Sequence, residues 1–147
     1  MIRFAGLYGK NRQIGTSWLN LTRQVDGTIP SPEKRLNLIH QDDCVGIIQR
    51  IIECNLRGEI MNACCDVHPT REELYRKAAL KRKESSVFTK DSASSGKIVS
   101  NQKLRKLLNY TFQHPNPLEA MDLLVNPLNQ QLVVNPDHPN FPVALAK

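Results

Sequence analysis

The stretch RLNLIHQDDCVGIIQRIIE, residues 35–53, decides the fold that this sequence predicts. A short apolar run leads to His40 and two aspartates, and apolar residues then recur at the spacing of a helix face. Asp42 or Asp43 can accept hydrogen bonds from the free N–H groups of a first helical turn. We therefore expect a helix that these carboxylates cap, with His40 as a structural group that braces the junction. The apolar positions at helical spacing are Val45, Ile48, Ile51 and Ile52.

Two apolar runs lie on either side of this helix in the sequence. Residues 1–8, MIRFAGLY, contain one charge and end before Gly9, and residues 59–64, EIMNAC, form the second run. Such runs are typical of buried strands in a parallel sheet. A helix between two such strands is a β-α-β crossover, so the sequence predicts an α/β fold.

Two more helices are indicated by local signals. Thr70 and Glu73 have the spacing of a capping box, which predicts a helix that continues to about Arg82. A short strand is expected at residues 97–100, and the next helix begins at Asn101, which is its expected cap.

The last segment, residues 115–147, contains six prolines and no glycine. No apolar face continues through it, so we expect a Pro-rich tail that is mostly extended or disordered. The folded domain is then residues 1–114.

The composition indicates a folded domain in a reducing compartment. Hydrophobic residues make up 40% and charged residues 23% of the chain, and the first apolar run is too short for a signal peptide, so we expect a cytoplasmic location. Cys44, Cys54, Cys64 and Cys65 include no CxxC pair. The run CCDVH at residues 64–68 is a possible metal cluster, but its spacing is poor for zinc and the end of a buried strand is favoured.

Positive charge is concentrated in residues 71–106. This segment contains eleven Lys and Arg residues against four acids, whereas the whole chain has a net charge of +6. An acidic partner could bind there. Nucleic acid is disfavoured because the segment lacks interleaved aromatic residues and any nucleic-acid-binding motif.

Several motifs occur in a fixed order along the chain: RFAGLYG at residues 3–9, LNLIHQDD at 36–43, EIMNA at 59–63 and GKIVSNQKLRKLLNYTF at 96–112. Together they resemble the C-terminal half of the extended short-chain dehydrogenase/reductases, the NAD-dependent epimerase/dehydratase family, in an atypical form. The resemblance extends over about residues 1–119. Its patterns are R-x-x-x-x-Y-G, then I-H-x-x-D, then a strand that ends in Asn.

This resemblance implies a partial Rossmann-like fold, made of the last parallel strands of the sheet with their crossover helix, plus a small C-terminal α/β lobe on the substrate side. Residues 1–114 would be the C-terminal part of an NAD(P)-binding domain, and residues 10–36 would contribute to a substrate lid. The site residues that it implies are Phe4, Ala5 and Gly6 near the nicotinamide and Tyr8, Asn37 and His40 on the substrate side. Family members that act on sugar nucleotides often have Asn at the position of Gly6 and Arg at that of Leu36, which argues against such a substrate here.

Two parts of the family's machinery are missing from the sequence. The seven glycines form no glycine-rich dinucleotide turn. The family's Tyr-x-x-x-Lys pair is also missing, because the residues four positions after Tyr8, Tyr75 and Tyr110 are Arg12, Ala79 and His114. We therefore expect a substrate-side fragment that neither catalyses nor binds NAD or NADP alone, and that pairs with a complementing N-terminal half or with itself. The alternative is a non-enzymatic module that binds an acidic partner through residues 71–106.

Overall fold

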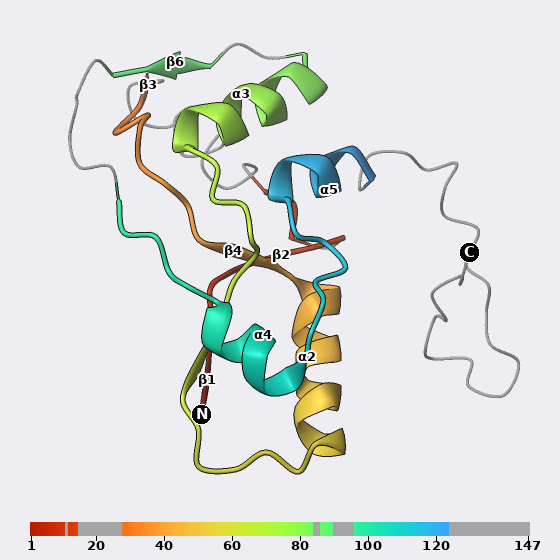
Figure 1. The fold of residues 1–147 in the computed structure, drawn as a ribbon. Coiled ribbons are helices and arrows are strands. Elements are labelled where there is room, and N and C mark those ends of the chain that lie inside the picture. Colours follow the sequence, from red (N-terminus) through yellow and green to blue (C-terminus); the bar gives the residue numbers. More distant parts are fainter. Residues whose placement is uncertain (11, 15–27, 84–85, 90–95, 124–147) are drawn as a thin grey trace, which may run out of the picture.

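The chain adopts a mixed α/β structure in a computed structural model (Figure 1). The structure describes residues 1–10, 12–14, 28–83, 86–89 and 96–123. Its elements, in chain order, are β1 (Ile2–Phe4), β2 (Gly6–Tyr8), β3 (Thr28–Ile29), β4 (Leu38–His40), α2 (Gln41–Glu53), β5 (Met61–Ala63), α3 (Arg71–Lys81), β6 (Val87–Phe88), α4 (Gln102–Leu108) and α5 (Pro117–Leu123). No helix in the described ranges is both long and apolar enough to cross a membrane.

The strands pair in parallel, as predicted, but the N-terminal run forms two strands instead of one. β1 pairs with β5 and β2 pairs with β4. The N-terminal run changes its partner strand between two consecutive residues. The amide of Ala5 donates to the carbonyl of Ala63, whereas the amide of Gly6 donates to the carbonyl of Asn37. The amide of Cys65 also donates to the carbonyl of Leu38. β4 therefore lies between β2 and the residues that follow β5. The chain segments that continue from β1 and β5 diverge around β4, and this divergence is called the fork.

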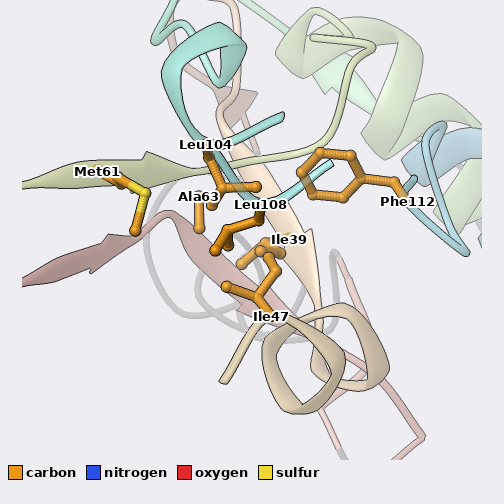
Figure 2. Close-up of a cluster of buried hydrophobic side chains, with 7 residues drawn as sticks. All are labelled: Ile39, Ile47, Met61, Ala63, Leu104, Leu108 and Phe112. Atoms are coloured by element: carbon orange, nitrogen blue, oxygen red, sulfur yellow. The ribbon is translucent and has the colours of Figure 1, made fainter. Parts of the chain in front are cut away.

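One hydrophobic core joins the fork to two helices. Side chains from β4, α2, β5 and α4 converge in it (Figure 2). Its buried members are Ile39, Ile47, Met61, Ala63, Leu104, Leu108 and Phe112. Because the core draws on segments from residue 39 to residue 112, the strands and both helices form one packed unit.

A second core forms a smaller lobe around α3 and α5, which lie together in the upper part of Figure 1. Its buried residues are Ile29, Leu74, Tyr75, Ala78, Ala79 and Met121. β3 and β6 pair in parallel beside it. The predicted fold class, a partial Rossmann-like sheet with a small α/β lobe, is thus confirmed.

The first run is mostly exposed and not buried as predicted, and one apolar face of α2 is also exposed. Ile47 is fully buried, whereas Val45, Ile48 and Ile52 are 55%, 46% and 72% exposed. In β1 and β2 only Tyr8 is buried. Along β1 the described residues provide a paired strand on one edge only.

Local signals predicted the remaining elements unevenly. The capping box at Thr70 is present and α3 ends at Lys81, as expected. Residues 97–100 form no strand, and the side chain of Asn101 makes no capping bond to α4. Residues 117–123 form α5 where an extended tail was predicted, and residues 124–147 lie outside the described part of the chain.

Candidate functional site

The junction of β4 and α2 is built around His40, which caps the helix. Its Nδ1 accepts a hydrogen bond from the backbone N–H of Asp42 at 3.2 Å. The capping role expected for Asp42 and Asp43 is therefore wrong, because the N-cap residue is His40, which precedes both aspartates. Since Nδ1 is an acceptor, the proton of the neutral ring is on Nε2.

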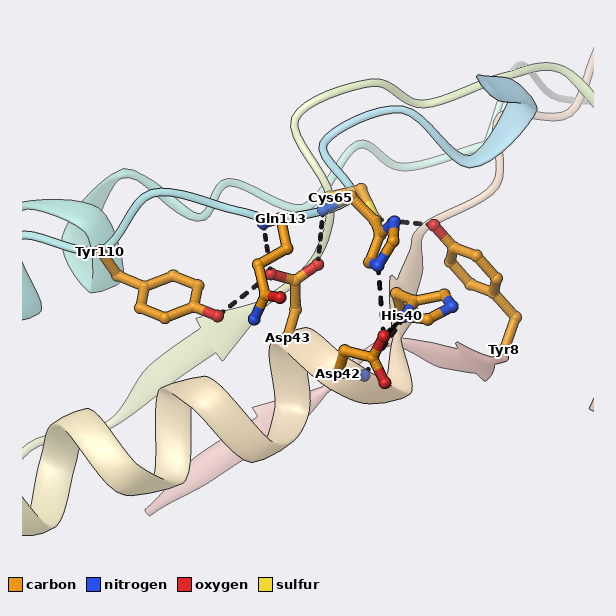
Figure 3. A network of polar contacts seen from close by, with 8 residues as sticks. Tyr8, His40, Asp42, Asp43, Cys65, Tyr110 and Gln113 are labelled. Atoms are coloured by element: carbon orange, nitrogen blue, oxygen red, sulfur yellow. Dashed lines mark hydrogen bonds and ion pairs between the residues drawn. The ribbon is translucent and has the colours of Figure 1, made fainter. Parts of the chain in front are cut away.

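Asp43 instead binds a segment far away in the sequence. Its carboxylate is fully buried and accepts hydrogen bonds from the hydroxyl of Tyr110 at 3.1 Å and from the amides of Gln113 at 2.7 Å and His114 at 3.1 Å (Figure 3). Gly46 leaves room for this contact, since a Cβ atom there would be 2.4 Å from the hydroxyl oxygen of Tyr110. The network fastens the segment that follows α4 to the first turn of α2.

The side chains of Asp42 and His114 also lie at this helix start, beside His40. The imidazole rings of His40 and His114 have centroids 3.8 Å apart. Oδ2 of Asp42 is 3.3 Å from Nδ1 of His40 and 3.3 Å from Nε2 of His114. Burial, and next the neighbouring His114, lower the pKa of His40, while the charges of Asp42 and Asp43 oppose this shift. His40 is therefore a neutral group at physiological pH.

Tyr8 lies beside this cluster on β2. Its ring meets that of His40 edge-on, with centroids 5.0 Å apart, and its hydroxyl is 3.7 Å from Sγ of Cys65. Burial raises the pKa of the Tyr8 phenol, and it also raises the pKa of the Cys65 thiol to about 12. Both groups therefore remain protonated and act as packing and hydrogen-bonding groups.

The residues implied by the family resemblance do not form one cluster. Tyr8 and His40 lie opposite each other in the β2–β4 register. The side chain of Asn37 is turned away to residues 97–99, where it donates to the carbonyl of Lys97 and accepts from the amide of Val99, both at 2.8 Å. The other three, Phe4, Ala5 and Gly6, follow the fork, with Phe4 and Gly6 exposed and Ala5 half-buried.

The polar side chains of Cys64, Cys65 and Asp66 have separate partners. Cys64 and Cys65 are both buried and directly follow β5, which agrees with the interpretation of this run as the end of a buried strand. The thiol of Cys64 donates to the carbonyl of Val99, and Asp66 accepts from the side chains of Asn101 and Arg105.

Sequence reasoning missed the roles of Asp43 and His114. The contacts of Asp43 join residues 67 to 71 positions apart, and no local pattern marks such pairs. A single histidine after a helix, as His114 is, has no signal that would have placed it against His40.

Comparison with known proteins gives the fold a wider context. No family model matches the chain. Protein YeeZ, present in two strains of Escherichia coli, is 30% identical over 120 residues, which cover 80% of this chain and 42% of YeeZ. The chain thus spans less than half the length of the curated relatives that it matches.

Solved structures resemble the chain over a similar share. A functionally unknown conserved protein from Silicibacter pomeroyi superposes with a TM-score of 0.64 at 20% identity, over 84% of this chain and 46% of that one. A human epimerase family protein with NADPH gives 0.62 at 17%, over 84% and 46%. UDP-N-acetylglucosamine 4-epimerase from Bacillus cereus gives 0.62 at 15%, over 84% and 43%. The chain therefore has the fold of a Rossmann-like epimerase/dehydratase structure, over a length equal to about half of such a protein.

Proposed function

We propose that this chain is the substrate-side part of an NAD(P)-dependent epimerase/dehydratase-like oxidoreductase of the extended short-chain dehydrogenase/reductase family. One observation carries the proposal: 84% of the chain superposes on less than half of an epimerase family protein whose structure contains NADPH. The similarity to YeeZ covers a comparable share. Catalysis then depends on a dinucleotide-binding part that is not encoded in these 147 residues.

The fork supports the place proposed for the nicotinamide. Ligands of parallel α/β sheets bind beyond the carboxyl ends of the strands, where neighbouring connections diverge. Phe4, Ala5 and Gly6 are at the carboxyl end of β1, where its partner changes from β5 to β4. In this proposal they border the nicotinamide, while Tyr8, Asn37 and His40 shape the substrate side by hydrogen bonding and packing.

The N-termini of the two longest described helices, α2 and α3, do not fit the pyrophosphate of a dinucleotide. Such a group needs the free N–H groups of a helix N-terminus without nearby negative charge. The first turn of α2 contains Asp42 and Asp43, and that of α3 contains Glu72 and Glu73. The seven glycines of the chain also form no glycine-rich turn, so we assign the pyrophosphate to the missing part.

We predict that the isolated chain binds neither NADH nor NADPH in the micromolar range. The test is calorimetric titration at millimolar cofactor, followed by coexpression with the part of YeeZ that lies outside the matched 120 residues. A complex that enhances the fluorescence of NADPH, when each part alone does not, is the expected result. Saturable micromolar binding to the isolated chain would contradict the proposal.

The exposed side of α2 is the surface proposed for that partner. Val45, Ile48 and Ile52, here called the α2 stripe, lie at helical spacing on one face and are largely exposed. Phe4 and Leu7 in the adjoining strands are also exposed. Apolar surface of this kind is typical of an interface. We propose that this surface binds the dinucleotide-binding part of the fold, whether that part is joined to this chain or separate. In the absence of that part, the surface of one chain binds the same surface of another.

We predict that the isolated chain forms oligomers through the α2 stripe. Size-exclusion chromatography with light scattering should give a mass above the 16.7 kDa of one chain. Ile48→Glu combined with Ile52→Glu should shift the mass towards the monomer, because burying two carboxylates in an interface is costly.

The matched control for this experiment is Leu80→Glu, which changes an equally apolar and 76% exposed residue on α3. It should leave the mass unchanged. A monomeric wild type at every concentration, or an equal shift in the control, would contradict the assignment of the surface. In coexpression, the same double variant should lose the complex and the control should keep it.

The alternative function, binding of an acidic partner through residues 71–106, receives less support. Among the described residues of this segment, five basic side chains form ion pairs within the chain, which lowers the charge available to a partner. The segment also contributes to α3 and α4, which lie in different parts of the molecule (Figure 1). A partner captured from cytoplasmic extract and released by raised salt would favour this alternative.

A further inference from the structure

We propose that His40, Asp42 and His114 bind a divalent transition-metal ion of the zinc type. Each offers one ligand atom, and the three atoms lie within 4.8 Å of one another. Two imidazoles and one carboxylate are a ligand set that zinc uses in sites with an open fourth position. Among the described residues this is the one group of three such side chains gathered closely enough.

Two of the three separations between ligand atoms match those of a metal site. With zinc–ligand bonds of about 2.0–2.1 Å, the ligand atoms of a tetrahedral site lie about 3.3–3.4 Å apart. Oδ2 of Asp42 is 3.3 Å from both Nδ1 of His40 and Nε2 of His114. The contact between His114 and Asp42 also meets the criteria of a long hydrogen bond, whereas Nδ1 of His40, which is an acceptor, cannot donate to the carboxylate. The carboxylate thus stands at ligand spacing from two nitrogen atoms.

The donor atoms are in suitable states. Nδ1 of His40 carries no proton, and its lone pair accepts the N–H of Asp42. A metal ion would take over this lone pair and displace a single capping hydrogen bond. Asp42 supplies the negative charge that a divalent ion requires. Its side chain is half-exposed, so it can reorient, and it leaves the open coordination position accessible to solvent.

The fold holds two of the three ligand residues, His40 and His114, in place. His40 is buried at the start of α2 and packs against Tyr8. The backbone amide of His114 is bound by Asp43. Binding requires the two imidazole nitrogens, which lie within 4.8 Å of each other, to approach to ligand spacing, and a bound ion would tie residue 114 to the start of α2 in addition to Asp43.

The test is calorimetric titration of the full chain with Zn²⁺, in a Cys54→Ser background because Cys54 is exposed. We expect one ion per chain, and at least tenfold weaker binding for His114→Ala and for Asp42→Ala. Both variants keep the backbone amides that the fold uses. His68→Ala, which removes a histidine outside the cluster, should bind as the parent does.

Cobalt provides a second readout that does not depend on the variants. Co²⁺ bound by two imidazoles and a carboxylate should give visible ligand-field absorption without the ultraviolet charge-transfer band of a thiolate. No stoichiometric binding by the parent, undiminished binding by His114→Ala, or a thiolate band would each overturn the proposal. None of these results depends on the proposed oxidoreductase role.

Discussion

Replacement of Asp43 by alanine should lower the free energy of unfolding by about 3 kcal/mol. Three donors lose their buried acceptor, and each unsatisfied donor costs about 1 kcal/mol or more. These donors are the hydroxyl of Tyr110 and the amides of Gln113 and His114. Urea unfolding followed by circular dichroism, in metal-free buffer, measures the change.

The matched control is Asp42→Ala at the neighbouring position. Its carboxylate is half-exposed, and the capping bond uses its backbone amide, which the substitution keeps. We expect a loss of no more than about 0.5 kcal/mol, as for most surface substitutions. Equal losses in the two variants would mean that the carboxylates cap α2 jointly, as the sequence first indicated.

Replacement of Ile47 by alanine should cost about 2 to 5 kcal/mol, the usual range for a fully buried isoleucine. Ile47 is completely buried between the strands and α4. Ile52→Ala removes the same atoms from the same helix, but at a largely exposed position, and should cost less than about 1 kcal/mol.

The pair of isoleucine variants is compared by urea unfolding at the lowest protein concentration that gives a signal, so that association contributes little. A larger loss for Ile52→Ala than for Ile47→Ala would mean that the opposite face of α2 is buried. The orientation of the helix described here would then be wrong.

Sequence signals between neighbouring residues predicted much of the fold. Which face of a helix is buried could not be predicted in this way. The capping box at Thr70 needs only two residues three positions apart, and it is present. The helix after His40 was also recognised, but α2 is apolar on two sides. Periodicity cannot decide between them, because the choice depends on which strands lie beside the helix.

The start of helix α5 is marked in the sequence by local signals, although the proline content of the segment favoured an extended tail. Asn116 accepts from the amide of Leu118 and donates to the carboxylate of Glu119, and Pro117 occupies the first helical position. These are ordinary helix-start residues. The proline content of the whole segment from residue 115 obscured them, since composition averages over many residues whereas a cap acts over four.

The insertion of β4 into the fork has a consequence for where the molecule can open. Leu38 has backbone contacts on both sides, to β2 through the paired register and to Cys65 through a hydrogen bond. A strand bonded on both edges detaches only when the hydrogen bonds on both sides break. Opening at the candidate site is therefore expected first in the segment around His114, which is held by its contacts with Asp43 and by one backbone hydrogen bond from Val67 to Pro115, and later in the strand that positions His40.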